Sequence, residues 1–256
     1  MTDREQKALD AILSAKNCRD ICPDTVRRVF METLPKYKSL KDADKAARDR
    51  LHQITGAFMT ADEIGRAEKR IAESGADALE ELWKLHSSTR ERLDSWRELY
   101  TRVFSVTGTV RSANDLACGL NPLMLAAMDV PVIRGCDIQG GAARVVNGWA
   151  ERAGRDIRIA CADLLCGVPE EEAELTLMMK LLPVLDRQKA GTAARLLAEC
   201  ASAWILVTYP TRTLGGRNVG MEQQYREYMA SVLPGDRDIA EEFVCGTELC
   251  FVLRRR

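Results

Sequence analysis

The stretch NDLACGLNP at residues 114–122 decides the fold of this chain. A predicted strand runs into Asp115, the small residues Ala117, Cys118 and Gly119 form a turn, and an Asn-Pro step closes it. Small residues at such a turn let the backbone approach a bound ligand closely. This pattern is typical of the first strand and loop of a Rossmann-like sheet that binds a nucleotide-like cofactor.

Strands and helices alternate from about residue 106 onward. The predicted strands cover residues 113–117, 132–136, 157–160, 175–179 and 204–207, and the predicted helices between them include 139–152 and 187–200. Such alternation predicts a parallel sheet with right-handed crossovers. Two further strands, 239–245 and 248–253, flank Gly246 and predict a terminal antiparallel hairpin. A parallel sheet closed by such a hairpin is the arrangement of methyltransferases that use S-adenosylmethionine (SAM).

The chain divides by composition into two predicted domains. Residues 1–105 are rich in Ala, Leu, Lys, Arg and Glu, and their apolar side chains recur every three or four positions, which predicts an all-helical domain. Residues 106–256 form the predicted α/β domain. The expected fold class is therefore a Rossmann-like SAM-dependent methyltransferase sheet with an antiparallel C-terminal hairpin, preceded by an all-helical N-terminal extension.

Local signals predict three helix starts in the first domain. Pro23 fits the first turn of a helix, where its missing backbone N–H has no cost. The patterns TADE at 60–63 and STRE at 88–91 both resemble a capping box. The helix predicted to begin at residue 88 continues to Val103 and carries core side chains.

Charge and cysteine content exclude several classes of protein. The formal net charge is −1, but residues 16–50 hold ten Lys or Arg against six Asp or Glu, and one basic face is enough to bind RNA. The nine cysteines form no CxxC pair, and only His52 and His86 could join them in a metal site. We therefore expect reduced, buried thiols, no metal and a cytoplasmic location. We also expect a monomer with no signal peptide, membrane span or membrane partner.

Three acids follow three successive predicted strands, where a parallel sheet binds its ligand. Asp115 and Asp137 are 22 residues apart, close to the spacing of about 20 that places an acid on the ribose hydroxyls. Asp163 could accept the adenine amino group, while Leu164 packs on the ring. An Asp after a strand is also a common helix N-cap, so each acid has a structural alternative. An NAD site is a further alternative, although the Gly-x-Gly-x-x-Gly pattern is absent.

Seven segments in both domains closely resemble the aminoglycoside-resistance 16S rRNA methyltransferases that modify guanine N7, and the acquired type more than the producer self-protection type. They are CPDTVRR (22–28), LHQITGAF (51–58), HSSTRERL (86–93), DLACGLNP (115–122), KLLP (180–183), PTRTLGGR (210–217) and GTEL (246–249). The resemblance implies 16S rRNA (guanine(1405)-N(7))-methyltransferase activity, with SAM as donor and S-adenosyl-L-homocysteine (SAH) as product. It also implies a helical domain that docks on the assembled 30S subunit, and resistance to 4,6-disubstituted aminoglycosides.

The resemblance further implies which residues bind the cofactor. The positions that match the family's SAM contacts are Phe58, His86, Ser87, Ser88, Arg92, Ala117, Asp137, Asp163, Leu164, Met179 and Gln188. Arg92 suits this role because a guanidinium can bind the methionine carboxylate through two hydrogen bonds. The candidate rRNA contacts are the basic residues Arg27, Arg28, Lys36, Lys38, Lys41 and Lys45, together with Arg212 and Arg217 in the glycine-rich loop 211–220.

Methylation of guanine N7 requires no general base, since N7 carries an in-plane lone pair and no proton. The lack of a convincing His/Asp or Cys/His pair fits this chemistry, in which alignment of N7, methyl and sulfur supplies most of the acceleration. No catalytic residue is assigned, and Tyr209 and Arg212 are candidates for holding the target base. Two alternatives stay open: a methyltransferase of a nearby decoding-site adenine or of a small molecule, and a non-catalytic RNA-binding protein with a relic methyltransferase fold.

Overall fold

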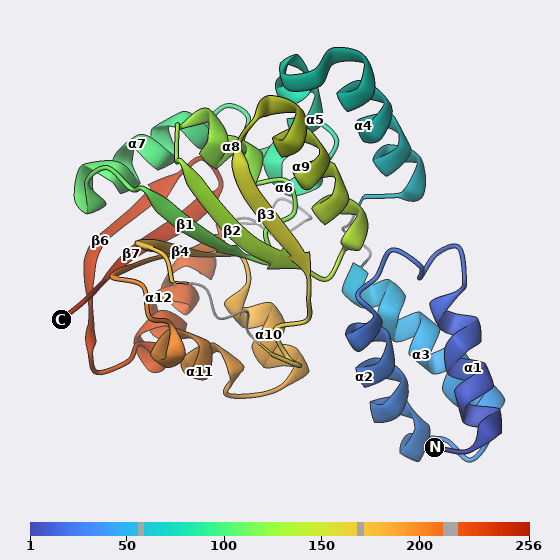
Figure 1. Cartoon of the computed structure of the whole chain (residues 1–256). Coiled ribbons are helices and arrows are strands. Elements are labelled where there is room, and N and C mark those ends of the chain that lie inside the picture. Colours follow the sequence, from blue (N-terminus) through green and yellow to red (C-terminus); the bar gives the residue numbers. More distant parts are fainter. Residues whose placement is uncertain (56–58, 168–171, 212–219) are drawn as a thin grey trace.

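A seven-stranded sheet forms the centre of the protein (Figure 1). The computed structural model describes residues 1–55, 59–167, 172–211 and 220–256. In the strand order β3-β2-β1-β4-β5-β7-β6, the strands are β1 (Ser112–Leu116), β2 (Val132–Asp137), β3 (Asp156–Cys161), β4 (Leu175–Met179), β5 (Trp204–Pro210), β6 (Arg237–Cys245) and β7 (Glu248–Arg255). Strands β1 to β5 run parallel, and β7 pairs antiparallel with both β5 and β6. The predicted fold class is therefore confirmed.

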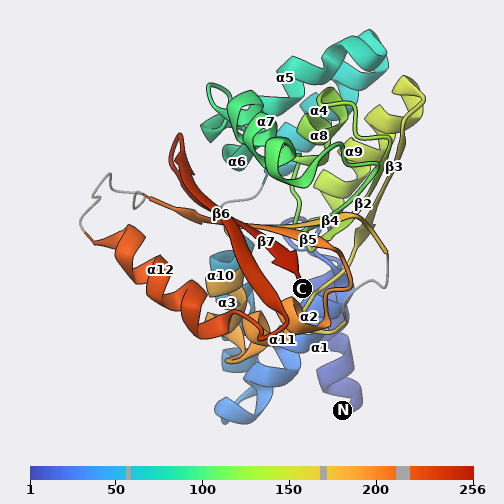
Figure 2. The same ribbon diagram turned by 90° about the vertical axis from the view of Figure 1, so that its left-hand side faces the viewer.

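Helices cover both faces of the sheet (Figure 2). One face carries α4 (Ala61–Ser74), α5 (Leu79–Trp83), α7 (Trp96–Thr107), α8 (Pro122–Ala127) and α9 (Gly140–Ala153), and the other carries α10 (Leu182–Gln188), α11 (Thr192–Glu199) and α12 (Met221–Val232). Two short elements, η2 (Gly75–Ala78) and α6 (Ser87–Glu91), lie between these helices in the chain. The apolar helix faces form two hydrophobic clusters with side chains from the strands, one on each side.

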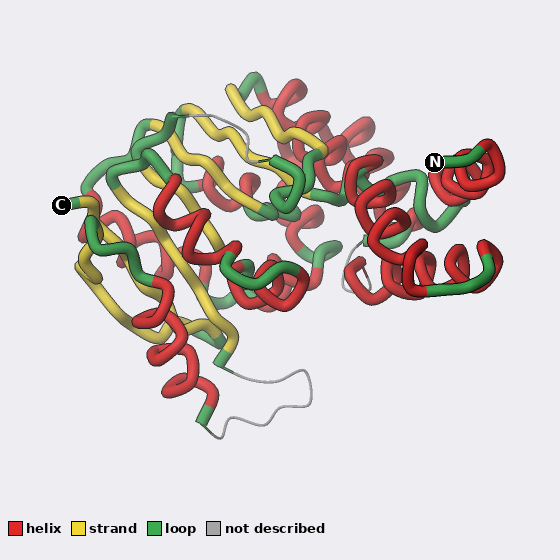
Figure 3. The backbone as a smooth tube through the Cα atoms, turned by 90° about the horizontal axis from the view of Figure 1, so that it is seen from below, coloured by secondary structure: helices red, strands yellow, loops and turns green. Residues whose placement is uncertain are grey.

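Residues 1–55 form a helical unit with its own core. The unit consists of α1 (Asp3–Leu13), α2 (Pro23–Thr33), the short η1 (Leu34–Lys36) and α3 (Leu40–Thr55). Its buried side chains, among them Ile12, Phe30 and Leu51, belong to a hydrophobic cluster drawn from residues 8–54. Figure 3 shows these helices as a group beside the sheet.

The helices between residues 61 and 107 pack with the sheet rather than with this helical unit. Ile64 of α4 and Leu99 of α7 belong to the same hydrophobic cluster as Ala113 of β1. The predicted boundary at residue 105 therefore marks the change from helices to strands, whereas the cores change between α3 and α4. Composition does not reveal this difference, because an amphipathic helix has the same periodicity whichever core it covers.

Local sequence signals predicted some helix ends correctly, but two predicted helices are interrupted in the structure. Pro23 is the first residue of α2, and residues 60–63 form the predicted capping box of α4. The helix predicted over 88–103 is interrupted between α6 and α7. The helix predicted over 187–200 is interrupted as well, because Gly191 adopts a left-handed conformation (φ +81°) between α10 and α11.

The helical unit attaches to the turn between β2 and α9. The backbone N–H of Cys22 donates to the carbonyl of Ile138 (2.7 Å), and that of Gly140 donates to the carbonyl of Asp20 (2.7 Å). A Cβ at residue 140 would press on the Sγ of Cys161 at 3.2 Å, so glycine suits this close approach. The unit is therefore joined to the sheet at the carboxyl end of β2.

The described residues offer neither a membrane-spanning helix nor a metal site. None of their helices is both long and apolar enough to cross a bilayer. No group of three His, Cys, Asp or Glu side chains among them could hold a metal ion. All nine cysteines are free thiols, and most are buried as expected. Cys161 is an exception, because it ends β3 at the edge of the sheet and is exposed.

Candidate active site

A cavity of about 1030 Å³ opens at the carboxyl ends of the parallel strands. It lies where the strand order reverses between β1 and β4, which is where open α/β sheets bind their ligands. Its wall includes Ala117 directly after β1, Asp137 at the end of β2, Asp163 shortly after β3 and Met179 at the end of β4. Its size is sufficient for a cofactor of several hundred daltons.

The loop after β1 enters the cavity wall with two left-handed backbone conformations. Ala117 has a φ of +56° and Gly119 a φ of +52°. A Cβ on Gly119 would lie 2.7 Å from Cε1 of His86, so a larger residue would collide with the imidazole ring. The N–H of Gly119 donates to Oδ2 of Asp137 (2.8 Å). This bond ties the β1 loop to the end of β2.

Asp137 ends β2 with its carboxylate in the cavity wall. While Oδ2 accepts from Gly119, Oδ1 accepts from the N–H of Gln139 (2.8 Å). Burial raises the pKa of this carboxyl, and the backbone donors oppose that rise. Each carboxylate oxygen can accept one more hydrogen bond. The position therefore suits the ribose hydroxyls that its spacing predicts.

Asp163 follows β3 and pairs with Arg28 of the helical unit. Its Oδ1 accepts from the N–H of Leu165 (2.8 Å), and its Oδ2 lies 2.9 Å from Nη2 of Arg28. Leu164 is buried beside it and also lines the cavity. Arg28 was predicted to contact rRNA, but its side chain is only 13% exposed and lines the same cavity. That prediction is corrected, because the guanidinium is directed at an acid of the cavity rather than at the surface.

His86 caps helix α6 and lies against the β1 loop. Its Nδ1 accepts from the N–H of Ser88 (3.2 Å), so His86 is the N-cap in place of the predicted Ser88. Burial and the nearby charge of Arg92 lower the pKa of His86 to about 4. The ring is therefore neutral at pH 7, with its proton on Nε2 because Nδ1 is an acceptor.

The lowered pKa of His86 predicts acid-sensitive stability. The unfolded chain binds a proton at this ring near pH 6.5 and the folded chain only near pH 4, so the free energy of unfolding should fall by up to about 3 kcal/mol as the pH drops through this window. His86→Asn keeps a capping acceptor and should flatten that part of the profile. Urea unfolding between pH 4 and 7 measures the effect, with the exposed His52→Asn as control. An unchanged slope in His86→Asn would assign the acid sensitivity to other groups.

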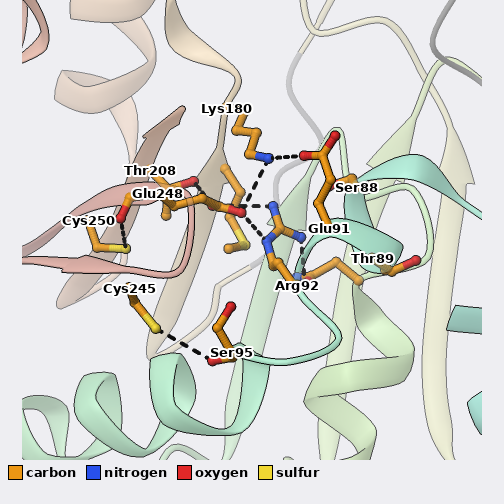
Figure 4. Close-up of polar contacts among 12 residues, drawn as sticks. Ser88, Thr89, Glu91, Arg92, Ser95, Lys180, Thr208, Cys245, Glu248 and Cys250 are labelled. Atoms are coloured by element: carbon orange, nitrogen blue, oxygen red, sulfur yellow. Dashed lines mark hydrogen bonds and ion pairs between the residues drawn. The ribbon is translucent and has the colours of Figure 1, made fainter. Parts of the chain in front are cut away.

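Arg92 is buried, and Figure 4 shows its polar contacts. Its Nε and Nη2 donate to the carboxylate of Glu248, and its Nη1 donates to Oδ1 of Asn121 (3.4 Å). The cavity-lining residues do not include it. The predicted position of Arg92 as a clamp in the cofactor site is therefore corrected, because its donors are directed at two buried partners of the protein.

Glu248 links Arg92 to the cavity. Its carboxylate accepts from Oγ1 of Thr208 on β5 (2.6 Å) and lies 3.4 Å from Nζ of Lys180 (Figure 4). Lys180 also donates to Oε2 of Glu91 on α6 (2.7 Å). Burial alone would raise the pKa of Glu248, but the charges of Arg92 and Lys180 lower it overall. Because Lys180 and Glu91 line the cavity, this network fixes one part of its wall.

The other predicted cofactor contacts lie in the cavity wall wherever the structure describes them. They are Ser87 and Ser88 at the start of α6, Met179 at the end of β4, and Gln188 at the end of α10. Phe58 lies outside the described residues. The cavity also includes residues that were not predicted. Ile54 and Thr247 lie inside two of the seven segments, whereas Val184 and Tyr225 lie outside all of them.

Tyr209 does not reach the cavity. Its side chain is fully buried, its ring stacks on Tyr225 with 4.7 Å between centroids, and its hydroxyl lies 3.4 Å from Sδ of Met229. Tyr209 is therefore a core residue, and its candidate role in holding the target base is corrected. Arg212 and Arg217 lie outside the described residues.

The other predicted rRNA contacts among residues 1–55 lie on the surface of the helical unit. Arg27 is exposed and pairs with Asp24 (3.3 Å). The exposed lysines surround the connection from α2 to α3, and none forms an ion pair within the described parts of the chain: Lys36, Lys38, Lys41 and Lys45. They form the basic face of the unit, a term used below for these four lysines.

The sheet order, the C-terminal hairpin and a cavity lined by two strand-end carboxylates define a SAM-dependent methyltransferase. The profile of the ribosomal RNA methyltransferase family FmrO matches residues 14–233. The chain belongs to this family, which confirms the resemblance of the seven sequence segments.

Known relatives match along nearly the whole chain. A 16S rRNA (guanine(1405)-N(7))-methyltransferase of Serratia marcescens is 39% identical over 248 residues, which cover 97% of each protein. The crystal structure of the 16S rRNA methyltransferase RmtF in complex with SAH superimposes with a TM-score of 0.93 at 49% identity, over 100% of both chains. The 16S rRNA methylase RmtB superimposes with a TM-score of 0.89 at 35% identity, again over 100% of both chains.

Proposed function

We propose that this protein transfers the methyl group of SAM to N7 of guanine 1405 in 16S rRNA. The main support is the cavity that carries Asp137 and Asp163 at the ends of two neighbouring strands, in a chain that aligns from end to end with RmtF. In this proposal Asp137 holds the ribose hydroxyls and Asp163 the adenine amino group, while Leu164 packs on the adenine ring.

The chemistry requires alignment rather than proton transfer. When bound, SAM would supply a sulfonium methyl whose carbon the N7 lone pair can attack directly. The N–C bond forms as the C–S bond breaks, the electron pair of that bond stays on sulfur in SAH, and the positive charge passes to the base. The neutral His86 and the thiol of Cys118, whose pKa burial raises, need no chemical role. An unpaired positive charge beside N7 would oppose the reaction, but Glu91 and Glu248 neutralise Lys180. Alignment of donor and acceptor then supplies most of the acceleration.

The helical unit of residues 1–55 is the proposed docking element for the 30S subunit, and residues 59–256 the proposed methyltransferase domain. The unit has its own core and carries the basic face, whose contacts to phosphates would position the enzyme without reading sequence. Arg212 and Arg217 remain proposed RNA contacts. The target guanine has to leave its stack, which costs a few kcal/mol. We propose that the protein works as a monomer in the cytoplasm.

The modified base accounts physically for aminoglycoside resistance. N7-methylguanine carries a positive charge and an added methyl group, and its N7 no longer accepts a hydrogen bond. A polycationic 4,6-disubstituted aminoglycoside at this base would therefore meet a steric clash and like-charge repulsion. Drugs that do not contact this guanine should stay active.

Methyl transfer to defined substrates tests the proposal. Purified protein is incubated with labelled SAM and 30S subunits, free 16S rRNA or buffer, and the modified base is mapped. We expect label on the 30S subunit at N7 of guanine 1405 and, in cells, resistance to 4,6-disubstituted drugs but not to apramycin. Label on a nearby adenine with apramycin resistance would favour the adenine alternative. SAM binding without any transfer would favour a non-catalytic RNA-binding protein.

Charge reversal on the basic face is expected to weaken docking alone. Lys41→Glu with Lys45→Glu should reduce 30S affinity at least about tenfold and make the salt dependence shallower, because each lost phosphate contact lowers the slope by about 0.7–0.9. Binding assays over a range of KCl concentrations measure this effect. The same exchange at the exposed Lys69 and Lys84 is the matched control, and SAH affinity should stay unchanged in both. Equal losses of 30S affinity in the two double variants would rule out a local docking face.

A further inference from the structure

Arg28 connects the helical unit to the wall of the cofactor cavity. Its Nε donates to Oδ2 of Asp163 (3.0 Å), its Nη2 to Oε1 of Gln188 (3.2 Å) and its Nη1 to Oε1 of Glu32 (3.4 Å). Asp163 follows β3, Gln188 ends α10, and both line the cavity. One guanidinium therefore joins α2 to two elements of the cofactor site.

The helical unit itself holds Arg28 in this position. Glu32, one turn further along α2, accepts from Arg28 and also pairs with Arg50 of α3 (2.7 Å). The neighbouring Arg27 has a different environment, since its side chain is 59% exposed and pairs with Asp24 at the surface. Two adjacent arginines on one helix thus have separate roles, one directed at solvent and one at the cavity.

Arg28 holds one of the two carboxylate oxygens of Asp163. Its side chain is 3% exposed, and its two oxygens have different partners, the N–H of Leu165 for Oδ1 and the guanidinium of Arg28 for Oδ2. These bonds fix the plane of the carboxylate and offset its negative charge. A carboxylate oxygen accepts an amino hydrogen well only when it is correctly oriented, and such a charge-assisted hydrogen bond is stronger than a neutral one. Removing Arg28 would leave a buried acid without its counter-ion.

We propose that Arg28 is a positioning residue for the adenine of SAM, and that it acts by holding the carboxylate of Asp163 in place. The inference rests on the proposed role of Asp163 in the cofactor site. Because Arg28 belongs to the helical unit, binding of the cofactor and seating of that unit on the sheet favour each other. The unit is then part of the cofactor site as well as the proposed docking element.

Two ligands that differ at the adenine amino group test the proposal by isothermal titration. S-inosyl-L-homocysteine carries a carbonyl oxygen where SAH has the amino group, so the analogue has an acceptor and no donor at this position. The wild-type protein should bind SAH at least about tenfold more tightly than this analogue. Arg28→Ala should weaken SAH about tenfold or more and bring the two affinities within about threefold of each other. Arg28→Lys keeps the charge and should recover part of the preference.

Arg27→Ala is the matched control and should leave both affinities unchanged. If Arg28 only stabilised the fold, its replacement would weaken the binding of both ligands equally and keep the preference for SAH, which would overturn the proposal.

Arg28→Gln serves as the neutral variant if Arg28→Ala unfolds at the assay temperature. Asp163→Asn distinguishes the role of Asp163 from that of Arg28. If Asp163→Asn bound SAH as tightly as the wild-type protein, Asp163 would not hold the adenine. If Asp163→Asn bound SAH more weakly but the Arg28 variants kept the preference for SAH over the inosyl analogue, only the role of Arg28 would be wrong.

Hydrogen–deuterium exchange tests the link between the cofactor and the helical unit. The N–H groups of Cys22 and Gly140 form the hydrogen bonds of the junction, so their exchange reports how firmly the unit is seated. SAH should slow exchange in these segments at least about threefold in the wild-type protein and less in Arg28→Ala. Equal slowing in both proteins would show that the link does not pass through Arg28.

Discussion

Asp137→Ala is expected to weaken SAH binding at least about 100-fold and to abolish methyl transfer at SAM concentrations that saturate the wild-type protein. Hydrogen bonds to a charged group contribute about 1.5–3 kcal/mol each, so the loss of two ribose contacts would cost about 3–6 kcal/mol. The replacement also removes the acceptors for the N–H groups of Gly119 and Gln139, which order the cavity wall. Isothermal titration with SAH measures the first effect directly.

Asp156→Ala is the matched control for this variant. Asp156 begins β3, at the opposite end of the sheet from the cavity, and pairs with Arg134 near the surface. Its replacement should leave SAH affinity unchanged. Thermal unfolding of both variants checks that the sheet is intact. If a folded Asp137→Ala protein bound SAH within about threefold of the wild-type affinity, the ribose assignment would be wrong.

The strands and their terminal acids could be predicted because their signals are local. A buried parallel strand requires a short apolar run, and the carboxyl ends of neighbouring strands meet at one edge whatever the helices between them do. Asp137 and Asp163 therefore share a cavity, as their places in the sequence predicted. The helix interruption at Gly191 is harder to predict, because glycine is also tolerated inside a helix at a cost of about 1 kcal/mol.

The partners of the arginines could not be predicted from local sequence. Arg92 pairs with Glu248, which lies 156 residues away, and Arg28 pairs with Asp163 at a separation of 135 residues. The sequence predicts that each arginine is in a helical region, but the packing of the helices on the sheet decides whether it meets solvent, a ligand or a buried acid. Arginine side chains are usually exposed, so only the structure reveals that Arg28 and Arg92 are directed into the protein.

The burial of Tyr209 could have been predicted from strand alternation. Side chains along β5 point alternately to the two faces of the sheet. Thr208 reaches Glu248 and Pro210 lines the cavity, whereas Tyr209 between them packs in the cluster on the other face. The short distance in sequence to Pro210 favoured a ligand role for Tyr209, whereas the alternation places its ring in the hydrophobic cluster of the opposite face.

Glu248→Ala is expected to lower the free energy of unfolding by about 3–5 kcal/mol, because it leaves Arg92 buried without its counter-ion. Both side chains are almost inaccessible, with 3% exposure for Arg92 and 1% for Glu248. The change also removes the acceptor for Thr208 and one of the two anions beside Lys180. Urea unfolding at pH 7 measures the loss. Methyl transfer should fall as well, since Lys180 lines the cavity.

Glu241→Ala provides the surface comparison for this buried pair. Glu241 of β6 pairs with Arg102 at 2.9 Å, but both side chains are partly exposed, so its loss should cost only about 0–1 kcal/mol. Replacing both buried partners, by Arg92→Met with Glu248→Leu, should recover much of the stability while methyl transfer stays low, because apolar side chains can fill the same space but cannot hold Lys180. A cost for Glu248→Ala no larger than that for Glu241→Ala would mean that the buried network does not support the cavity wall.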